Sequence, residues 1–154
     1  MLAWLEATAL ATWTRESPSI WAYPLVLTLH TLGLGIVVGA SAVIDLRFLG
    51  VARRISIPSL APLFRIILWA FVLNAVTGVL LFIADATHKA GQTVFYIKLG
   101  LIGLALWNTV LARHVVLGPA QNDAAPSSRH SRLAVVSLLL WFGAITAGRL
   151  MAYL

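Results

Sequence analysis

The chain has 154 residues, of which 60% are hydrophobic and 10% charged, and its formal net charge is +6. A typical soluble domain is about 45–50% apolar and about 25% charged, so a water-soluble protein is nearly excluded. The sequence has no cysteine, which excludes disulfides, thiolate metal sites, iron–sulfur clusters and covalently attached c-type haem. The positive charge is typical of residues that flank membrane spans, so we expect no nucleic-acid partner.

Residues 1–16 carry apolar side chains at helical spacing, with polar residues between them, before Pro18 interrupts the pattern. This pattern predicts a short amphipathic helix that lies at the membrane interface. A polar tail without regular structure is the alternative. The segment lacks the basic start and the long apolar region of a signal peptide.

Apolar stretches make up most of the remaining chain, and about 20 apolar residues cross a bilayer as a helix. We expect membrane-spanning helices at about 20–44, 66–84, 94–112 and 133–152. Residues 17–154 then form one domain, and no room remains for a separate soluble domain. The predicted fold class is all-α, a bundle of four transmembrane helices preceded by the interfacial helix.

Basic residues indicate how the bundle crosses the membrane. Seven of the eleven Lys and Arg residues lie in the first and third connections between the expected spans. Cytoplasmic loops are enriched in Lys and Arg, so both connections are expected inside and both termini outside. Aromatic residues mark the expected outer boundary, as membrane interfaces favour Trp and Tyr: Trp21, Tyr23, Tyr96 and Tyr153.

Few polar side chains interrupt the expected spans, and an ionisable group in hydrocarbon costs at least about 2.5–3.5 kcal/mol. These residues are therefore expected to face the bundle interior, where one connected polar network is geometrically possible. At about 1.5 Å per helical residue, His30 lies near the bilayer centre and Lys98 lies about one turn inside the outer boundary. With a nearby glycine, they form the candidate cofactor-binding site: His30, Gly33, Asn74, Thr77, Lys98 and Asn108.

His30 is the candidate metal ligand. A neutral imidazole binds haem iron, and four-helix bundles hold haem between facing helices, so His30 is a candidate axial ligand to b-type haem. Gly33, on the same helix face, would leave space for the flat macrocycle. The alternative is a histidine that hydrogen-bonds a neighbouring helix and only stabilises the bundle.

The other histidines limit the haem hypothesis. His114 lies about 15 Å from the level of His30, so one iron cannot bind both side chains within one chain. His88 and His130 are expected in loops, as solvated surface residues. Single-histidine ligation, a different second ligand or a site shared across a dimer remain open.

Two further patterns concern packing and charge. Gly35 and Gly39 form a small-xxx-small pair, which predicts close helix packing. Asp45 lies at the expected inner boundary near three arginines, and these residues form either a charge cluster or a topology signal: Arg47, Arg65 and Arg113. Motifs of hydrolases and of phosphoryl-transfer enzymes do not appear, so these reaction classes are not expected.

Short motifs resemble those of bacterial membrane families. The runs at 29–33 and 45–50 are similar to the first span of a widespread uncharacterised bacterial family of four-helix membrane proteins. Thr77-Gly78, with Lys98 followed ten residues later by Asn108, resembles the core of the CopD-type copper-resistance membrane domain. The resemblance covers about residues 17–115.

HemJ-type protoporphyrinogen oxidases are similar in scale and have a histidine in the first helix and a lysine in the third, which correspond here to His30 and Lys98. These resemblances imply two different uses of one scaffold, metal handling and haem-linked redox chemistry. The chain has no cysteine and no methionine within its first three expected spans, so a copper path has too few soft ligands. Haem binding needs only one good axial ligand.

The resulting prediction is a multi-pass protein of the bacterial cytoplasmic (inner) membrane that binds a redox cofactor, b-type haem, around His30. Lys98 would pair with a propionate or with an anionic substrate group, and the role would be electron transfer or an oxidoreductase reaction. The alternative is a non-enzymatic copper-uptake or copper-resistance component, or a small structural subunit. A homodimer or a larger membrane complex is the expected assembly.

Overall fold

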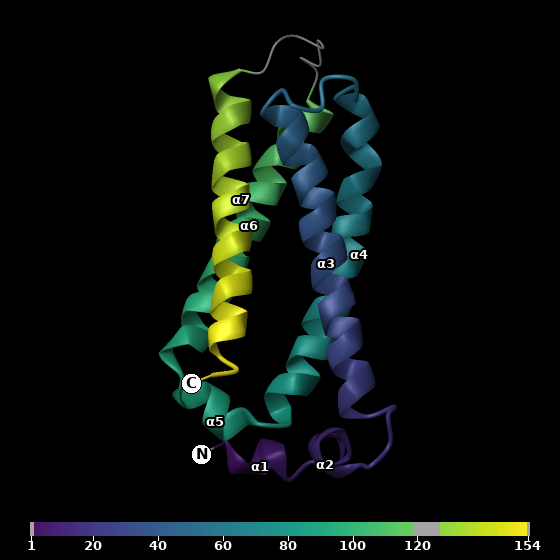
Figure 1. The fold of residues 1–154 in the computed structure, drawn as a ribbon, viewed down its shortest axis with the longest axis vertical. Helices are drawn as coiled ribbons and strands as arrows, with labels where there is room; N and C mark the ends of the chain where they lie inside the picture. Colours follow the sequence, from purple (N-terminus) through teal and green to yellow (C-terminus); the bar gives the residue numbers. More distant parts are fainter. Residues whose placement is uncertain (1, 119–126, 154) are drawn as a thin grey trace.

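A computed structural model describes residues 2–118 and 127–153 of the chain, and this part contains helices and no strand. The four longest helices form an elongated bundle (Figure 1). They are α3 (Tyr23–Phe48), α4 (Ala61–Ile83), α6 (Thr93–Leu117) and α7 (Ser128–Leu150). All four are long and apolar enough to cross a bilayer. The predicted fold class is therefore confirmed, and the chain is a multi-pass membrane protein in contact with lipid.

The observed helices differ from the predicted spans mainly at one end of the bundle. α3 continues through Asp45 and Arg47, because both side chains are buried and the Arg47 Nε donates to the Ile55 carbonyl at 2.5 Å. α4 begins five residues before the predicted span, at Ala61 rather than at 66. It follows a short 3-10 turn, η1 (Pro58–Leu60), and has a proline in its first turn, where a missing N–H costs no hydrogen bond.

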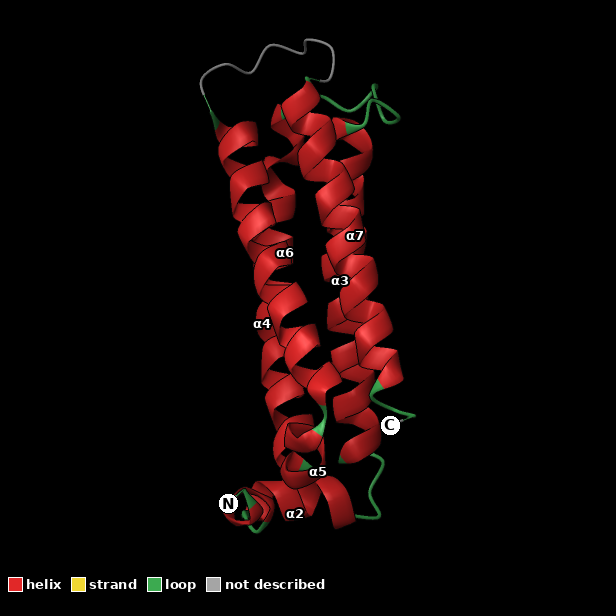
Figure 2. Cartoon of the chain, turned by 90° about the vertical axis from the view of Figure 1, so that its left-hand side faces the viewer, coloured by secondary structure: helices red, strands yellow, loops and turns green. Residues whose placement is uncertain are grey.

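The N-terminal segment forms two short helices rather than one, α1 (Ala3–Glu6) and α2 (Ala9–Glu16). The chain divides at Thr8, whose hydroxyl caps α2 by accepting from the Ala11 N–H at 3.3 Å. Figure 2 shows α2 lying across the end of the bundle, nearly perpendicular to the long helices. Trp4 is 67% exposed and Trp13 is 46% exposed, as expected of aromatic side chains at a membrane interface.

The long helices pack in the order α4, α3, α7, α6. α3 packs against α4 and α7, α7 packs against α6, and α4 and α6 make few contacts. Both termini lie at one end of the bundle (Figure 1), and we call the half of the bundle at this end the terminal half and the other the loop half.

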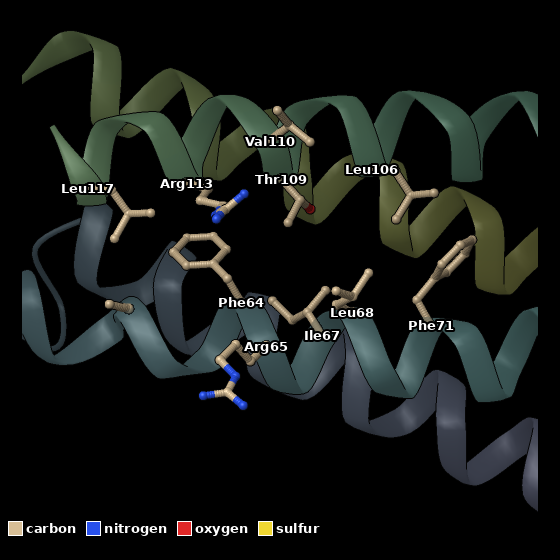
Figure 3. Close-up of a pocket in the computed structure, with 11 residues that line it drawn as sticks. Phe64, Arg65, Ile67, Leu68, Phe71, Leu106, Thr109, Val110, Arg113 and Leu117 are labelled. Atoms are coloured by element: carbon tan, nitrogen blue, oxygen red, sulfur yellow. The ribbon is translucent and has the colours of Figure 1, made fainter.

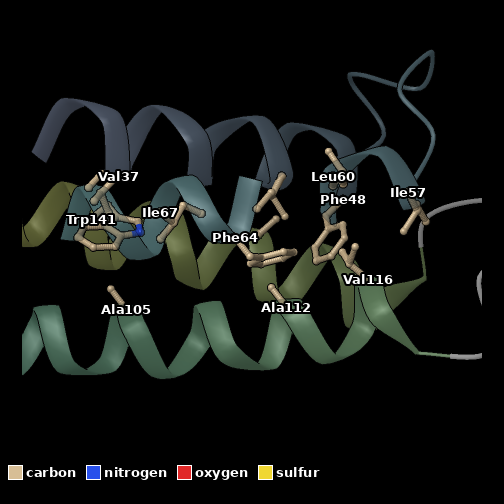
Figure 4. Close-up of a cluster of buried hydrophobic side chains, with 13 residues drawn as sticks. Val37, Phe48, Ile57, Leu60, Phe64, Ile67, Ala105, Ala112, Val116 and Trp141 are labelled. Atoms are coloured by element: carbon tan, nitrogen blue, oxygen red, sulfur yellow. The ribbon is translucent and has the colours of Figure 1, made fainter. Parts of the chain in front are cut away.

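The main cluster of buried apolar side chains fills the loop half and reaches only to the middle of the bundle (Figure 4). Its members nearest the terminal half are Val37 in α3, Ala70 in α4, Ala105 in α6 and Trp141 in α7. All other members lie farther from the termini along their own helices or in the turn before α4. The polar residues expected to form a site therefore lie mostly outside this core cluster.

Arg15 links α2 to the end of α4 by donating from its Nη1 to the Ala84 carbonyl at 3.3 Å, and α1 is linked to the chain after α4 by Glu6. Its carboxylate accepts a hydrogen bond from the Thr87 backbone N–H at 2.6 Å, in the first turn of α5 (Ala86–Gly91). The N–H groups of a first helical turn have no partner within their own helix, so an anion there is favourable. This bond is the main reason that the pKa of Glu6 is lowered from its usual 4.5.

We predict that Glu6→Ala speeds hydrogen exchange at the Thr87 amide, because its acceptor is lost. Because the folded-state pKa is lowered, the contact is complete above the ordinary pKa and is lost as pH falls through the folded-state value. Glu16→Ala is the matched control, since among the described residues Glu16 pairs with its neighbour Arg15 alone, at 2.8 Å. Equal Thr87 protection in the two variants would contradict the prediction.

Candidate functional site

His30 lies at the contact between α3 and α4, where its ring bonds α4 and its backbone carbonyl accepts a bond from α4. Its ring Nδ1 lies 3.0 Å from the Asn74 carbonyl oxygen and 3.1 Å from the Thr77 hydroxyl. The Asn74 side-chain amide donates back to the His30 carbonyl at 2.7 Å. The pair is therefore reciprocal, and it places His30, Asn74 and Thr77 together as the sequence suggested.

The contacts of His30 define which ring nitrogen carries the proton. The Asn74 carbonyl can only accept, and the Thr77 hydroxyl donates to the Leu73 carbonyl at 2.7 Å. Nδ1 therefore carries the hydrogen and donates it to Asn74. Nε2 keeps its lone pair and has no hydrogen-bond partner within residues 2–118 and 127–153.

Glycines allow the close approach of α3 and α4 around this histidine. A Cβ at Gly33 would lie 3.1 Å from the Ala70 carbonyl oxygen, and a Cβ at Gly78 would lie 3.1 Å from His30 Cε1. The space that we expected beside Gly33 for a macrocycle is thus filled by α4. Within the described part of one chain, the expected close packing at Gly35 and Gly39 does not occur, because a Cβ at either would meet nothing within 4 Å.

Lys98 and Asn108 lie away from the His30 contact, so the structure does not connect the six candidate residues in one network. Lys98, on α6, runs its side chain past α7, and a Cβ at Gly148 would lie 3.5 Å from its Cε. Lys98 remains within electrostatic range of His30, and no acidic side chain of the described chain forms an ion pair with it. Asn108 lies in the loop half and donates to the Leu133 carbonyl at 3.0 Å.

The remaining histidines do not join this site. His88 lies 3.4 Å from the Asp85 carboxylate at the terminal end. His130 lies in the first turn of α7 rather than in a loop, because it forms a capping box with Ser127 and its ring packs 4.9 Å from that of Phe48. His114 is exposed near the end of α6. The described residues contain no group of three or more His, Cys, Asp or Glu side chains that could hold a metal.

A second feature is an apolar groove of about 420 Å³ between α4 and α6, in the loop half (Figure 3). It lies where these two helices make few contacts, and Phe64, Phe71 and Leu106 are among its walls. Arg65 and Arg113 line it as well. Among the described residues, neither Arg65 nor Arg113 forms an ion pair with Asp45.

Comparison with other proteins identifies no relative: no protein-family model, no curated protein and no solved structure matches the chain. The resemblance to CopD-type and HemJ-type proteins therefore stays a prediction, which rests on the short motifs quoted above.

The glycine contacts generate a prediction about stability. Gly33→Ala and Gly78→Ala should each destabilise the bundle by about 1–3 kcal/mol, because the added methyl group overpacks the α3–α4 contact. Gly35→Ala is the matched control on the same helix and should be neutral or stabilising by up to about 1 kcal/mol, from helix propensity alone. Thermal unfolding in detergent measures all three. Equal midpoints for Gly33→Ala and Gly35→Ala would show that the close approach contributes nothing.

Proposed function

We propose that this protein binds a b-type haem in the terminal half of the membrane bundle, with His30 as the axial ligand. The observation that carries the proposal is the orientation of His30. Its Nδ1–H is fixed by the Asn74 carbonyl 3.0 Å away, which leaves Nε2 as a neutral nitrogen with a free lone pair. Metal-ligating histidines almost always donate their other ring N–H to a carbonyl or carboxylate, which fixes the tautomer and the ring orientation.

The charge of this region supports an anionic cofactor. Lys98 lies within a predicted membrane span without an acidic partner in the described chain, and an uncompensated cation there is costly. Lys89, at the same end, donates to the Leu81 carbonyl, and burial lowers the pKa of its ammonium group. Both cations are within electrostatic range of His30. The two propionates of haem would supply the missing negative charge.

The packing also favours this half of the bundle. The large apolar side chains of the core cluster lie in the loop half (Figure 4), and α3 and α7 diverge toward the terminal end in Figure 1. A flat macrocycle bound in this half, between the α3–α4 pair and the α6–α7 pair, would lie outside the core cluster. Haem supplies one-electron redox chemistry, which suits electron transfer or an oxidoreductase reaction in the bacterial inner membrane.

A structural role is the second candidate, and the reciprocal bonds between His30 and Asn74 favour it. These bonds join α3 to α4 without any ligand, as interhelical hydrogen bonds do in membrane bundles. His30 would then only stabilise a small subunit of a larger assembly. A copper component has less support, because the donors around His30 are oxygen and nitrogen and the chain has no cysteine.

Visible absorption of the detergent-purified protein, produced with ample haem, separates these functions. We expect a Soret band that shifts on reduction with dithionite in the wild type and is lost in His30→Ala. Lys98→Met should keep the band but weaken haem affinity by about tenfold, as expected for the loss of one ion pair of about 1.4 kcal/mol. Haem titration of the apoprotein measures this affinity.

His114→Ala is the matched control, because it removes an exposed histidine of α6 far along the bundle and should leave the spectrum unchanged. A colourless wild-type protein with no metal, together with a lower unfolding temperature in His30→Ala, would contradict haem binding and support the structural role. Stoichiometric copper in a colourless preparation would instead support the copper alternative.

A further inference from the structure

Asp45 is a buried carboxylate that forms no ion pair with another described residue, and it lies apart from the His30 contact. It is 3% exposed, and its Oδ2 has no hydrogen-bond partner. No basic side chain of the described chain forms an ion pair with it. One turn earlier on α3, the hydroxyl of Ser41 is equally buried and also lacks a partner. Two unsatisfied polar atoms thus lie on one face of one helix, inside the bundle.

These atoms line a single small cavity. The cavity measures about 10 Å³ and lies between α3, α6 and α7, with Phe64 of α4 also in its wall; its polar lining is Ser41, Asp45, Asn108, Thr109 and Ser137. The Ser137 hydroxyl neighbours the Asp45 carboxyl in the cavity wall, and the Asn108 amide nitrogen donates to the Leu133 carbonyl. Both serines and Asn108 therefore keep oxygen lone pairs for an occupant of the cavity.

An unpaired carboxylate cannot stay ionised in this setting at low cost. Transferring an isolated charge into an apolar medium is far more costly than burying a neutral polar group, so the carboxylate must carry a proton or bind a cation. A proton would give the carboxyl one O–H, which can bond one neighbouring oxygen, whereas a cation contacts several oxygens at once. A cation would satisfy Asp45 and Ser41 together.

The donor set and the size of the cavity define the kind of cation. All the available ligands are oxygens, which suit hard ions rather than copper or zinc. Only one of them is charged, and the described residues contain no group of three acidic or histidine side chains. Ca²⁺ takes 6–8 oxygen ligands and Mg²⁺ keeps several waters, so neither fits a cavity that holds about one small particle. A monovalent ion without its hydration shell matches both charge and volume.

We propose that Asp45, Ser41, Ser137 and Asn108 form a sodium-binding site inside the membrane bundle. The bound ion neutralises Asp45 and joins α3, α6 and α7, since each helix supplies an oxygen. The site is independent of the His30 region, so it stands whether or not the protein binds haem.

Thermal unfolding of the full chain in detergent tests this site, with NaCl replaced stepwise by choline chloride at constant ionic strength and pH. A ligand that binds only the folded state raises the midpoint with the logarithm of its concentration. At sodium concentrations above the dissociation constant, we expect the unfolding midpoint to rise by about 3–6 °C for each tenfold increase in sodium. KCl should give a clearly smaller rise, because the cavity is small.

Asp45→Asn should abolish the sodium dependence, because the shape is kept and the charge is removed. Asp85→Asn is the matched control, since it removes a carboxylate at the terminal end and should leave the dependence unchanged. Ser41→Ala should move half-saturation to at least about tenfold higher sodium, and it tests the site even where Asp45→Asn fails to fold. Equal wild-type midpoints in NaCl and choline chloride, or an unchanged sodium dependence in Asp45→Asn, would overturn the proposal.

Discussion

The bundle depends on one constraint, that a polar group inside the membrane needs a partner within the protein. Hydrocarbon offers no water, so each unsatisfied group costs several kcal/mol. His30 and Asn74 meet this constraint by bonding each other's backbone carbonyl, which joins α3 to α4 at two points. Gly33 and Gly78 make this exchange possible, because a side chain at either would force the helices apart. The polar pair and the two glycines are therefore one structural unit.

The two halves of the bundle are held together by different kinds of contact. In the loop half, large apolar side chains such as Phe48, Phe64 and Trp141 form a core that draws on all four helices. In the terminal half, hydrogen bonds and glycine contacts hold α3 to α4, while Lys98 lies along α7 on the other side of the bundle. A large cofactor is accommodated better in the terminal half, because in the loop half it would displace the side chains of the core cluster. For this reason the proposed haem site and the sodium site lie in different halves.

Composition was enough to predict the fold class, the four spans and the interfacial segment, because 20-residue apolar stretches have few alternatives. The sequence also predicted that His30, Asn74 and Thr77 lie together, because polar side chains in neighbouring spans hydrogen-bond each other. The expected link to Lys98 and Asn108 does not form in the described chain, because spacing along one helix does not fix which neighbour a side chain meets. Gly35 and Gly39 also show that spacing does not identify the neighbour. Their pattern predicts close packing, yet no other helix of the described chain covers their face of α3.

The most informative polar residue was Asp45, which sequence analysis placed at a membrane boundary as a counter-charge for arginines. The structure buries it beside Ser41 and Ser137, two residues too ordinary in membrane helices to single out from sequence. His30 and Asp45 differ in where their unpaired atoms lie. The Nδ1 of His30 bonds α4 and only its Nε2 lacks a partner among the described residues, whereas Asp45 Oδ2 and the Ser41 hydroxyl lack partners at one cavity. The free Nε2 favours a ligand with an empty coordination position, and the two unpaired oxygens favour a cation between them.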